Sequence, residues 1–410
     1  MVGSVVALWV MGGAGCGDAV DEGAVESGVE DDDAISADDC ADDEQFNPAT
    51  GQCVDAGDDS VDDDDDDDDS SDDDNGDGDE NGADECGPGS INGQTCRPDG
   101  GILPGADVVI AGEDCDGDEF AMSTEADGGG YYTFDDVPAG EHDLTITSGS
   151  FETTDEITVN ADEETDLTSH AAKVCLDGDE AEIAVFEGMF DDVGTILDNM
   201  DIDHDAYSGG STLGDSAHDL ITDIEALLEY DILFIECQVD KPTGDDEALA
   251  LENLQRFVEE GNSVYASDRA HPWIYMALPN AIDFALPDYD DDTLRSNIQT
   301  GSPSGSTGTY TADVVSDEMN TLLGADTVDF HFDTGAWTIV TGEGTASTPH
   351  FELNPDTWGS GDDIDNASVV TTYDDPVGNG RIIYTSFHNS AQDQIDGEME
   401  EIMEYMIFQL

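Results

Sequence analysis

A stretch near the middle of the chain, residues 253–279, constrains what the C-terminal half can fold into. It closes a helix whose apolar residues recur at roughly helical spacing: Leu249, Leu251, Leu254, Phe257 and Val258. Gly261 and Asn262 then supply a left-handed stop, and Ser263 to Ala266 form a short expected strand. In an open α/β sheet, ligands and chemistry lie beyond the carboxyl ends of the strands. We therefore expect a functional site directly after Ala266.

Polar residues occupy that position, namely Asp268, Arg269 and His271. Small residues, Ala266 and Ala270, stand two before and two after Asp268. A sharp strand-to-helix turn of the nucleophile-elbow type requires this spacing on steric grounds. The residue at its centre is an aspartate, however, and not a cysteine or serine. An aspartate at the end of a strand is also a common N-cap of the following helix, so both interpretations stay open.

Apolar strands and helices alternate from Glu182 onward. The expected strands are 183–186, 202–207, 231–235, 263–266, 368–373 and 381–386, and the expected helices are 191–200, 219–228 and 398–408. Asp191 is the expected cap of the first of these helices. Alternation of this kind predicts an α/β domain of flavodoxin-like type, with a mostly parallel sheet and helices on both faces.

The chain is extremely acidic, with 103 Asp and Glu residues against 7 Lys and Arg and a formal net charge of -96. Residues 1–85 hold 32 of the acidic residues and none of the basic ones, so the excess extends through the foldable part as well. Such a chain repels itself unless salt screens its charges, which indicates a halophile's protein. Nucleic-acid binding is excluded because no basic patch could neutralise phosphates. Cations are the favoured partners.

The N-terminus, residues 1–16, carries an apolar run followed by the small residues Gly13, Ala14 and Gly15 and then Cys16. This pattern resembles a bacterial lipoprotein signal. The resemblance implies secretion across the inner membrane, acylation of Cys16, and anchoring in the cell envelope, at the outer membrane or cell surface. A plain secretory signal is the alternative. The run is too short to span a bilayer usefully.

Residues 17–85 read as a disordered, extended stalk, since a run of eight aspartates and few aromatic residues cannot offset chain entropy by burial. Within it, Cys40 and Cys53 bracket a turn-rich segment and are candidates for a small disulfide loop.

The same stalk contains a pattern with calcium-loop spacing, formed by Asp73, Asn75, Asp77 and Asp84. The alternative is a solvated acidic linker without a specific site. Apart from this Ca²⁺ hypothesis, no cofactor is expected.

Residues 86–172 differ in composition from the acidic segment before them. Short runs rich in β-forming residues alternate with Gly- and Pro-containing turns, which predicts a small antiparallel β-sandwich. The runs are 106–110, 120–124, 131–134, 142–147 and 156–159. The segments PGADV, GYYTF and VPAG closely resemble the carboxypeptidase regulatory-like (transthyretin-like) domain. That resemblance implies a seven-stranded sandwich that serves as a spacer or adhesion module without catalysis of its own.

Four cysteines frame this expected sandwich, Cys86, Cys96, Cys115 and Cys175, and could form two disulfides in an oxidising compartment. Their connectivity cannot be derived from the sequence. Cys237 is then left over as a free thiol. A lone cysteine invites a nucleophile interpretation, but the apolar run before Cys237 favours a buried structural role or a disulfide.

Residues 173–410 resemble the class I glutamine amidotransferase-like fold, in its trehalose-utilisation-like branch. The segments that carry the resemblance are DILFIEC, RFVEEGNSVYASD and GRIIYTSFHN. In that family a cysteine occupies the elbow, and a late histidine followed by an acid completes a triad. Here the elbow position is Asp268, and His388 is followed by Asn389 and Ser390. The resemblance therefore implies an amidotransferase-like domain that lacks its thiolate nucleophile.

We expect a non-catalytic binding or scaffold protein of the cell envelope, with a lipid anchor in the membrane and an envelope protein or polysaccharide as partner. The alternative is a hydrolase for a small envelope or sugar-derived substrate. It would use Asp268 as a carboxylate nucleophile and His388 as its base, with His271 as a further candidate. A hydrogen-bonded acid on His388 favours the enzyme, and a cleft filled by Trp273 or Tyr275 favours the scaffold. The histidines show no zinc-type spacing.

Overall fold

The chain divides into two units, residues 17–81 and the remainder. The computed structural model describes residues 44–47, 52–55, 86–209, 216–239, 244–285, 304–332, 337–341, 346–358, 364–378, 380–388 and 397–410. In the smaller unit, β1 (Glu44–Asn47) pairs antiparallel with β2 (Gln52–Asp55). Within the described residues, no helix is both long and apolar enough to cross a membrane.

Three expectations for the N-terminal part involve residues outside those ranges. They are acylation of Cys16, a bridge from Cys40 to Cys53, and a calcium loop of Asp73, Asn75, Asp77 and Asp84. All three stay predictions.

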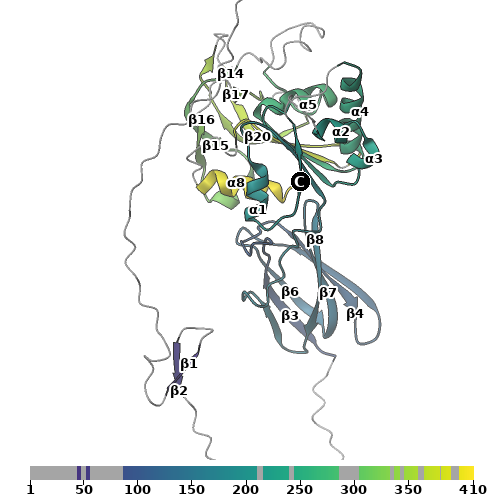
Figure 1. The fold of residues 1–410 in the computed structure, drawn as a ribbon. Coiled ribbons are helices and arrows are strands. Elements are labelled where there is room, and N and C mark those ends of the chain that lie inside the picture. Colours follow the sequence, from purple (N-terminus) through teal and green to yellow (C-terminus); the bar gives the residue numbers. More distant parts are fainter. Residues whose placement is uncertain are drawn as a thin grey trace, which may run out of the picture. The chain divides into compact units, whose positions relative to one another are not determined.

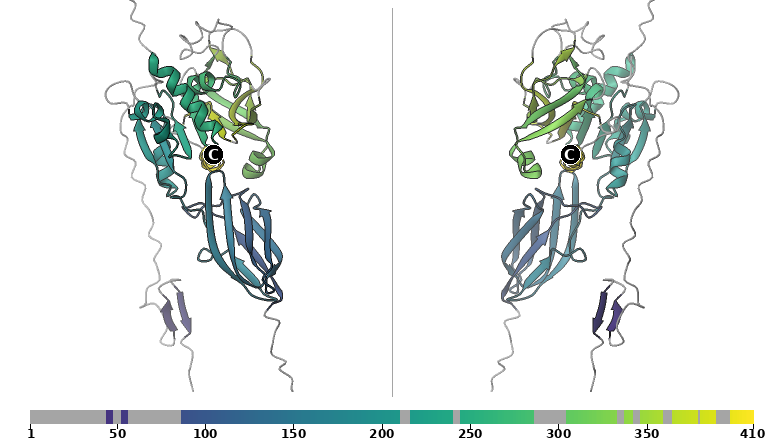
Figure 2. Two further views of the ribbon diagram at one scale, coloured as in Figure 1. Left: turned by 90° about the vertical axis from the view of Figure 1, so that its right-hand side faces the viewer. Right: turned by 90° about the vertical axis from the view of Figure 1, so that its left-hand side faces the viewer.

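Residues 86–172, all of which are described, form the predicted β-sandwich with seven strands in two sheets (Figures 1 and 2). One sheet has the order β6-β3-β9 and the other β5-β4-β7-β8. The strands are β3 (Pro88–Gln94), β4 (Asp107–Glu113), β5 (Glu119–Glu125), β6 (Tyr131–Pro138), β7 (Gly140–Ser148), β8 (Phe151–Val159) and β9 (Glu164–Leu167). Alternate residues of β4 and β7, among them Val108, Ile110, Leu144 and Ile146, are buried between the sheets.

Two disulfides connect the four framing cysteines. Cys86 bonds to Cys115 and Cys96 bonds to Cys175. The second bridge closes 79 residues of chain and ties strand β3's end to the start of the following domain. Bridges of this kind persist in oxidising, extracytoplasmic compartments.

Residues 183–388 contribute the strands of a nine-stranded mixed sheet in the described part of the chain, with the order β11-β10-β12-β13-β21-β20-β18-β15-β16. The first five are mutually parallel and are β10 (Ile183–Glu187), β11 (Asp205–Ser208), β12 (Ile232–Ile235), β13 (Ser263–Ser267) and β21 (Arg381–Thr385). This order reverses between β10 and β12, as in a doubly wound α/β sheet. The predicted α/β fold class is confirmed, and the sheet that carries it is mixed.

The sheet continues through antiparallel strands that the sequence analysis anticipated only in part. They are β20 (Ala367–Asp374), β18 (Thr348–Leu353), β15 (Gly308–Val314) and β16 (Thr327–Phe332). A separate three-stranded sheet has the order β17-β14-β19 and consists of β14 (Ser304–Gly305), β17 (Trp337–Thr338) and β19 (Thr357–Trp358). It matters for the site because Thr338 donates to Asp268.

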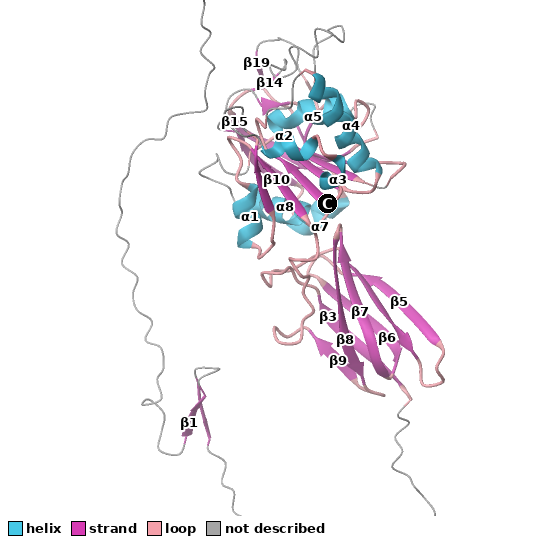
Figure 3. Cartoon of the chain, turned by 45° about the vertical axis from the view of Figure 1, so that its right-hand side comes forward, coloured by secondary structure: helices cyan, strands magenta, loops and turns pink. Residues whose placement is uncertain are grey.

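Helices cover both faces of the parallel strands (Figure 3). One apolar cluster joins the sheet to α2 (Ser216–Ile221), α3 (Ile224–Leu227), α4 (Asp245–Glu259) and α5 (His271–Ala277). The other joins it to α1 (Val193–Asn199), α7 (Asp317–Leu323) and α8 (Gly397–Ile407).

Two helix boundaries differ from the expectation. Helix α1 is capped by Asp192, whose side chain accepts from the Thr195 amide, and not by Asp191. The single helix expected over residues 219–228 is two helices, because Asp223 caps α3 by accepting from the amides of Glu225 and Ala226. An aspartate side chain that bonds to nearby backbone competes with helix continuation.

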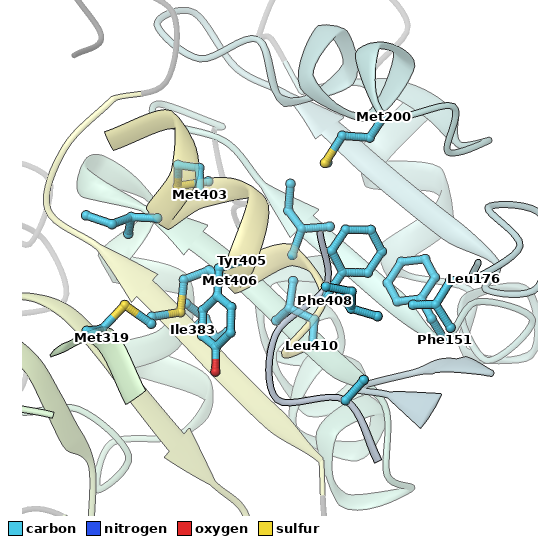
Figure 4. Packing of buried hydrophobic residues seen from close by; sticks show 14 of the residues in the cluster. Phe151, Leu176, Met200, Met319, Ile383, Met403, Tyr405, Met406, Phe408 and Leu410 are labelled. Atoms are coloured by element: carbon cyan, nitrogen blue, oxygen red, sulfur yellow. The ribbon is translucent and has the colours of Figure 1, made fainter. Parts of the chain in front are cut away.

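The C-terminal residues pack the α/β domain against the sandwich (Figure 4). The rings of Phe151 and Phe408 lie 4.9 Å apart between centroids, and Ser148 Oγ donates to the Phe408 carbonyl at 2.8 Å. Gly149 at the β7–β8 turn has φ +57°, and a Cβ there would lie 2.1 Å from the Leu410 carbonyl oxygen. One apolar cluster therefore runs continuously through both domains.

Candidate functional site

Three neighbouring parallel strands each place one reactive side chain at the same edge of the sheet. Cys237 follows β12, Asp268 follows β13, and His388 follows β21. Because parallel strands end on the same side, residues far apart in sequence meet here. The three side chains are buried, with exposed fractions of 1% for Cys237, 2% for Asp268 and 4% for His388.

Asp268 lies in a strained turn with the steric properties expected of an elbow. Its φ is +34°, in the left-handed region that a non-glycine residue rarely adopts. Ala266 and Ala270 on either side are completely buried, as the small flanking residues of such a turn would be. The strand β13 passes directly into a short 3₁₀ turn, Asp268–Ala270, and then into α5. Strain of this kind persists where the surroundings hold it in place.

Asp268 and His388 form a buried ion pair. Asp268 Oδ2 lies 2.9 Å from His388 Nε2, and Asp268 Oδ1 accepts from the Thr338 amide at 2.6 Å. Burial acts to raise the pKa of Asp268, but the bond to His388, together with the His388 and Arg269 charges, holds that pKa below its usual value. Burial acts to lower the pKa of His388, and the bond and charge of Asp268 outweigh it, so this pKa is raised. Each side chain therefore favours the charged form of the other.

Cys237 is free and joins this pair. Its Sγ lies 3.0 Å from His388 Nε2, and the thiol points toward Asp268 Oδ2 at 3.7 Å. Burial raises the pKa of Cys237, and the negative charges of Asp268 and Asp191 raise it further. The sulfur is therefore a neutral thiol at neutral pH. A thiolate nucleophile would need a lowered pKa instead.

The same nitrogen of His388, Nε2, faces both the thiol and the carboxylate. In a nucleophile–histidine–acid relay, one ring nitrogen serves the nucleophile and the other serves the acid. The three residues therefore do not have the geometry of a Cys-His-Asp triad. Their donor atoms converge on one point instead.

His271, Trp273 and Phe190 lie around the three side chains. His271 Nδ1 lies 3.2 Å from the Asp268 carbonyl oxygen and 3.2 Å from Thr338 Oγ1, so it supports the turn from behind and does not join the cluster. Trp273 is buried and its Nε1 donates to the Val239 carbonyl at 3.1 Å. Phe190 is the aromatic that covers His388, with ring centroids 5.8 Å apart.

Glu236 and Asp191 complete the surroundings and were not singled out as site residues by the sequence analysis. Glu236 accepts from the amides of Gly188 at 2.7 Å and Val193 at 2.8 Å, at the point where the strand order reverses. Burial raises the pKa of Glu236 to about 7. Asp191 Oδ2 accepts from the Cys237 amide at 2.7 Å and from the Ser267 hydroxyl. A charged residue directly after the apolar run DILFI was the available signal.

Comparison with protein-family models identifies the sandwich domain. Residues 90–171 match the family model of the carboxypeptidase regulatory-like domain, which confirms the resemblance inferred for the sandwich. No curated protein matches the chain.

Solved structures with similarity to the chain were also found. A glutamine amidotransferase from Thermotoga maritima shares 9% identity with a TM-score of 0.30, over 56% of this chain and 93% of that one. The Bacillus anthracis TIE protein shares 12% identity with a TM-score of 0.18, over 22% of this chain, and this chain spans 16% of the TIE protein. A type II cohesin-X-dockerin complex from Acetivibrio cellulolyticus shares 22% identity with a TM-score of 0.17, over 27% of this chain and 70% of that one.

Proposed function

We propose that the protein is a non-catalytic binding or scaffold protein of the cell envelope of a halophilic bacterium. The observation that carries the proposal is the state of the elbow position. Its side chain, Asp268, is a buried carboxylate whose two oxygens are already bonded, one to His388 and one to the Thr338 amide. The side chain is also only 2% exposed, so neither oxygen is presented to a substrate.

The environment of the elbow supports the same interpretation. The neighbouring thiol of Cys237 is neutral and shares the Nε2 atom of His388 with the carboxylate. Phe190 packs over the His388 ring. These contacts make the edge of the sheet a closed, internally satisfied cluster, in keeping with an amidotransferase-like domain of the trehalose-utilisation-like branch that has lost its reaction.

Two features of the covalent chemistry of the chain support the proposed location. Two disulfides favour an oxidising compartment, and the Cys16 motif implies a lipid anchor. The acidic stalk would hold the folded part away from the membrane, in salt, where an envelope protein or polysaccharide is the partner. Mass spectrometry of the mature N-terminus tests the anchor, since an acylated Cys16 supports it and an unmodified upstream sequence contradicts it.

A hydrolase is the second candidate, favoured by one observation. The strained φ of +34° at Asp268 and the 2.9 Å contact to His388 are the geometry that a carboxylate nucleophile and its base would use. Ester, amide and glycoside substrates assayed in molar salt, with wild type beside Asp268→Asn, separate the two functions. The scaffold proposal predicts no turnover by either protein, whereas turnover that disappears in an Asp268→Asn variant shown to be folded by circular dichroism would establish the hydrolase.

A further inference from the structure

The edge of the sheet where β12, β13 and β21 end has the composition of a metal site. Cys237 Sγ, Asp268 Oδ2 and His388 Nε2 all lie within 4.8 Å of one another. Within the described residues, it is the one group of three or more such side chains that close together. All three are buried, so the group differs from the exposed acidic clusters that a chain of this composition produces by chance.

The donor set and its spacing fit zinc. Thiolate, imidazole and carboxylate are the ligands that Zn²⁺ takes in proteins, and bond lengths near 2.0–2.3 Å place tetrahedral donors about 3.4–3.6 Å apart. The observed separations are 2.9 Å from His388 to Asp268, 3.0 Å from His388 to Cys237, and 3.7 Å from Cys237 to Asp268. Opening two of these distances by roughly half an ångström would admit the ion.

The convergence on a single ring nitrogen points in the same direction. A catalytic relay needs both nitrogens of His388, whereas coordination needs only one, with the other donors aimed at the same point. Here Nε2 faces the sulfur and the carboxylate oxygen together. The arrangement that argues against a triad is therefore the arrangement that a metal ion requires.

Outer contacts already hold two of the three donor residues, Asp268 and Cys237. Asp268 Oδ1 accepts from the Thr338 amide at 2.6 Å, which turns Oδ2 toward the cluster. Tyr384 donates its hydroxyl to the Asp268 carbonyl at 2.6 Å. The Cys237 amide donates to Asp191 at 2.7 Å. Hydrogen bonds of this kind orient ligands in metal sites and strengthen binding.

We propose that Cys237, Asp268 and His388 form a buried zinc site that clips the ends of three neighbouring strands together. Binding exchanges protons for the ion, since Zn²⁺ replaces the thiol proton of Cys237 and the Nε2 proton of His388. Two positive charges enter and two leave, so the buried cluster stays neutral. The ion enters as the domain folds, because the site is closed. This inference goes beyond the scaffold function and does not depend on it.

Cobalt binding tests the site directly, because Co²⁺ replaces Zn²⁺ and its bond to a thiolate gives a charge-transfer absorption in the near ultraviolet. The full chain is unfolded in denaturant with a chelator to remove metal, freed of the chelator, and refolded in molar NaCl with increasing CoCl₂, with excess Mg²⁺ to occupy the carboxylates of the stalk. We expect one equivalent of thiolate-bound cobalt, displaced by zinc. Cys237→Ser should abolish the absorption, and His388→Gln should weaken binding by at least about 10-fold.

His350→Gln is the matched control. His350 is also a buried histidine of this domain, but it bonds to Ser316 and Thr372 and lies outside the cluster. This variant should bind cobalt as wild type does. An absent thiolate absorption in wild type, or one that persists in Cys237→Ser, would overturn the proposal.

A second measurement needs no variant and so does not depend on a mutant's folding. In partly denaturing urea, zinc should slow alkylation of Cys237 by iodoacetamide in the wild-type chain, while the same concentration of magnesium should not. Equal alkylation rates with and without zinc would contradict the site.

Discussion

His388 Nε2 lies 2.9 Å from Asp268 Oδ2, so two residues 120 positions apart in sequence form a buried ion pair at the ends of adjacent strands. Neighbouring contacts from Thr338 and Tyr384 hold Asp268 in its strained turn. The pair thus stabilises the same turn that, in an enzyme of this fold type, would present the nucleophile. Stability and catalysis make opposite demands on this position.

Removing either side chain of this pair should destabilise the fold. In metal-free protein, Asp268→Asn and His388→Gln should each lower the free energy of unfolding by about 3–5 kcal/mol, because the other charge is left buried without a partner. The double variant should lose less than the sum. Denaturation in molar salt measures all three. Asp329→Asn, an exposed strand residue, serves as control and should change stability by less than about 0.5 kcal/mol. Additive losses would show that the two side chains do not interact.

Acid should destabilise the fold through His350. Burial, with a smaller contribution from the Arg381 charge, lowers the pKa of His350 to about 4 from its usual 6.5. The unfolded chain therefore binds a proton that the fold rejects, and stability present above pH 6.5 is lost as pH falls toward 4. The loss from this residue should reach about 3 kcal/mol. Denaturant titrations between pH 4 and pH 7 should show a shallower decline in His350→Gln. An identical slope in wild type and variant would refute the assignment.

Salt should stabilise the folded part. The screening length falls from about 30 Å at 0.01 M salt to about 3 Å at 1 M, and repulsion among the many surface carboxylates falls with it. We expect Tm to rise by at least about 5 °C over this range, equivalent to roughly 2 kcal/mol. Sodium chloride and potassium chloride should act alike if screening is the cause. A melting temperature independent of salt would contradict the halophile interpretation.

The contact between the sandwich and the C-terminus should couple the two domains. Phe151→Ala and Phe408→Ala should each lower the free energy of unfolding by about 3–5 kcal/mol, since both rings are completely buried. Their effects should be non-additive by about 1 kcal/mol, because the rings touch. Calorimetry of wild type should give one transition for both domains. Two separate transitions in wild type would show that the domains unfold independently.

The proximity of Asp268 and His388 could be predicted from the sequence, since each residue follows an apolar strand and parallel strands end on the same side of the sheet. Cys237 obeys the same rule. Its place in the cluster depends on β12 lying next to β13, and strand order is set by long-range packing that local pattern does not encode. The apolar run before Cys237 indicated only that it is buried.

Other elements were missed for local reasons. Strand β3, PGSINGQ, is rich in turn-forming residues, and its extended form is imposed by pairing with β6 and β9. Strand β16, TVDFHF, is different, because its sequence alternates polar and apolar residues and so carried a strand signal that was not used. Asp223 interrupts a helical apolar pattern through its own side-chain bonds, which periodicity alone does not reveal.

The most direct test of the scaffold account is the accessibility of Cys237 in the native, metal-free protein. Iodoacetamide labelling in molar salt with a chelator present, followed by peptide mass spectrometry, measures it. The closed cluster predicts that Cys237 stays unlabelled until denaturant is added, since its side chain is buried and its pKa is raised. Rapid labelling of native Cys237 would mean an open site with a reactive thiol, and would contradict the account.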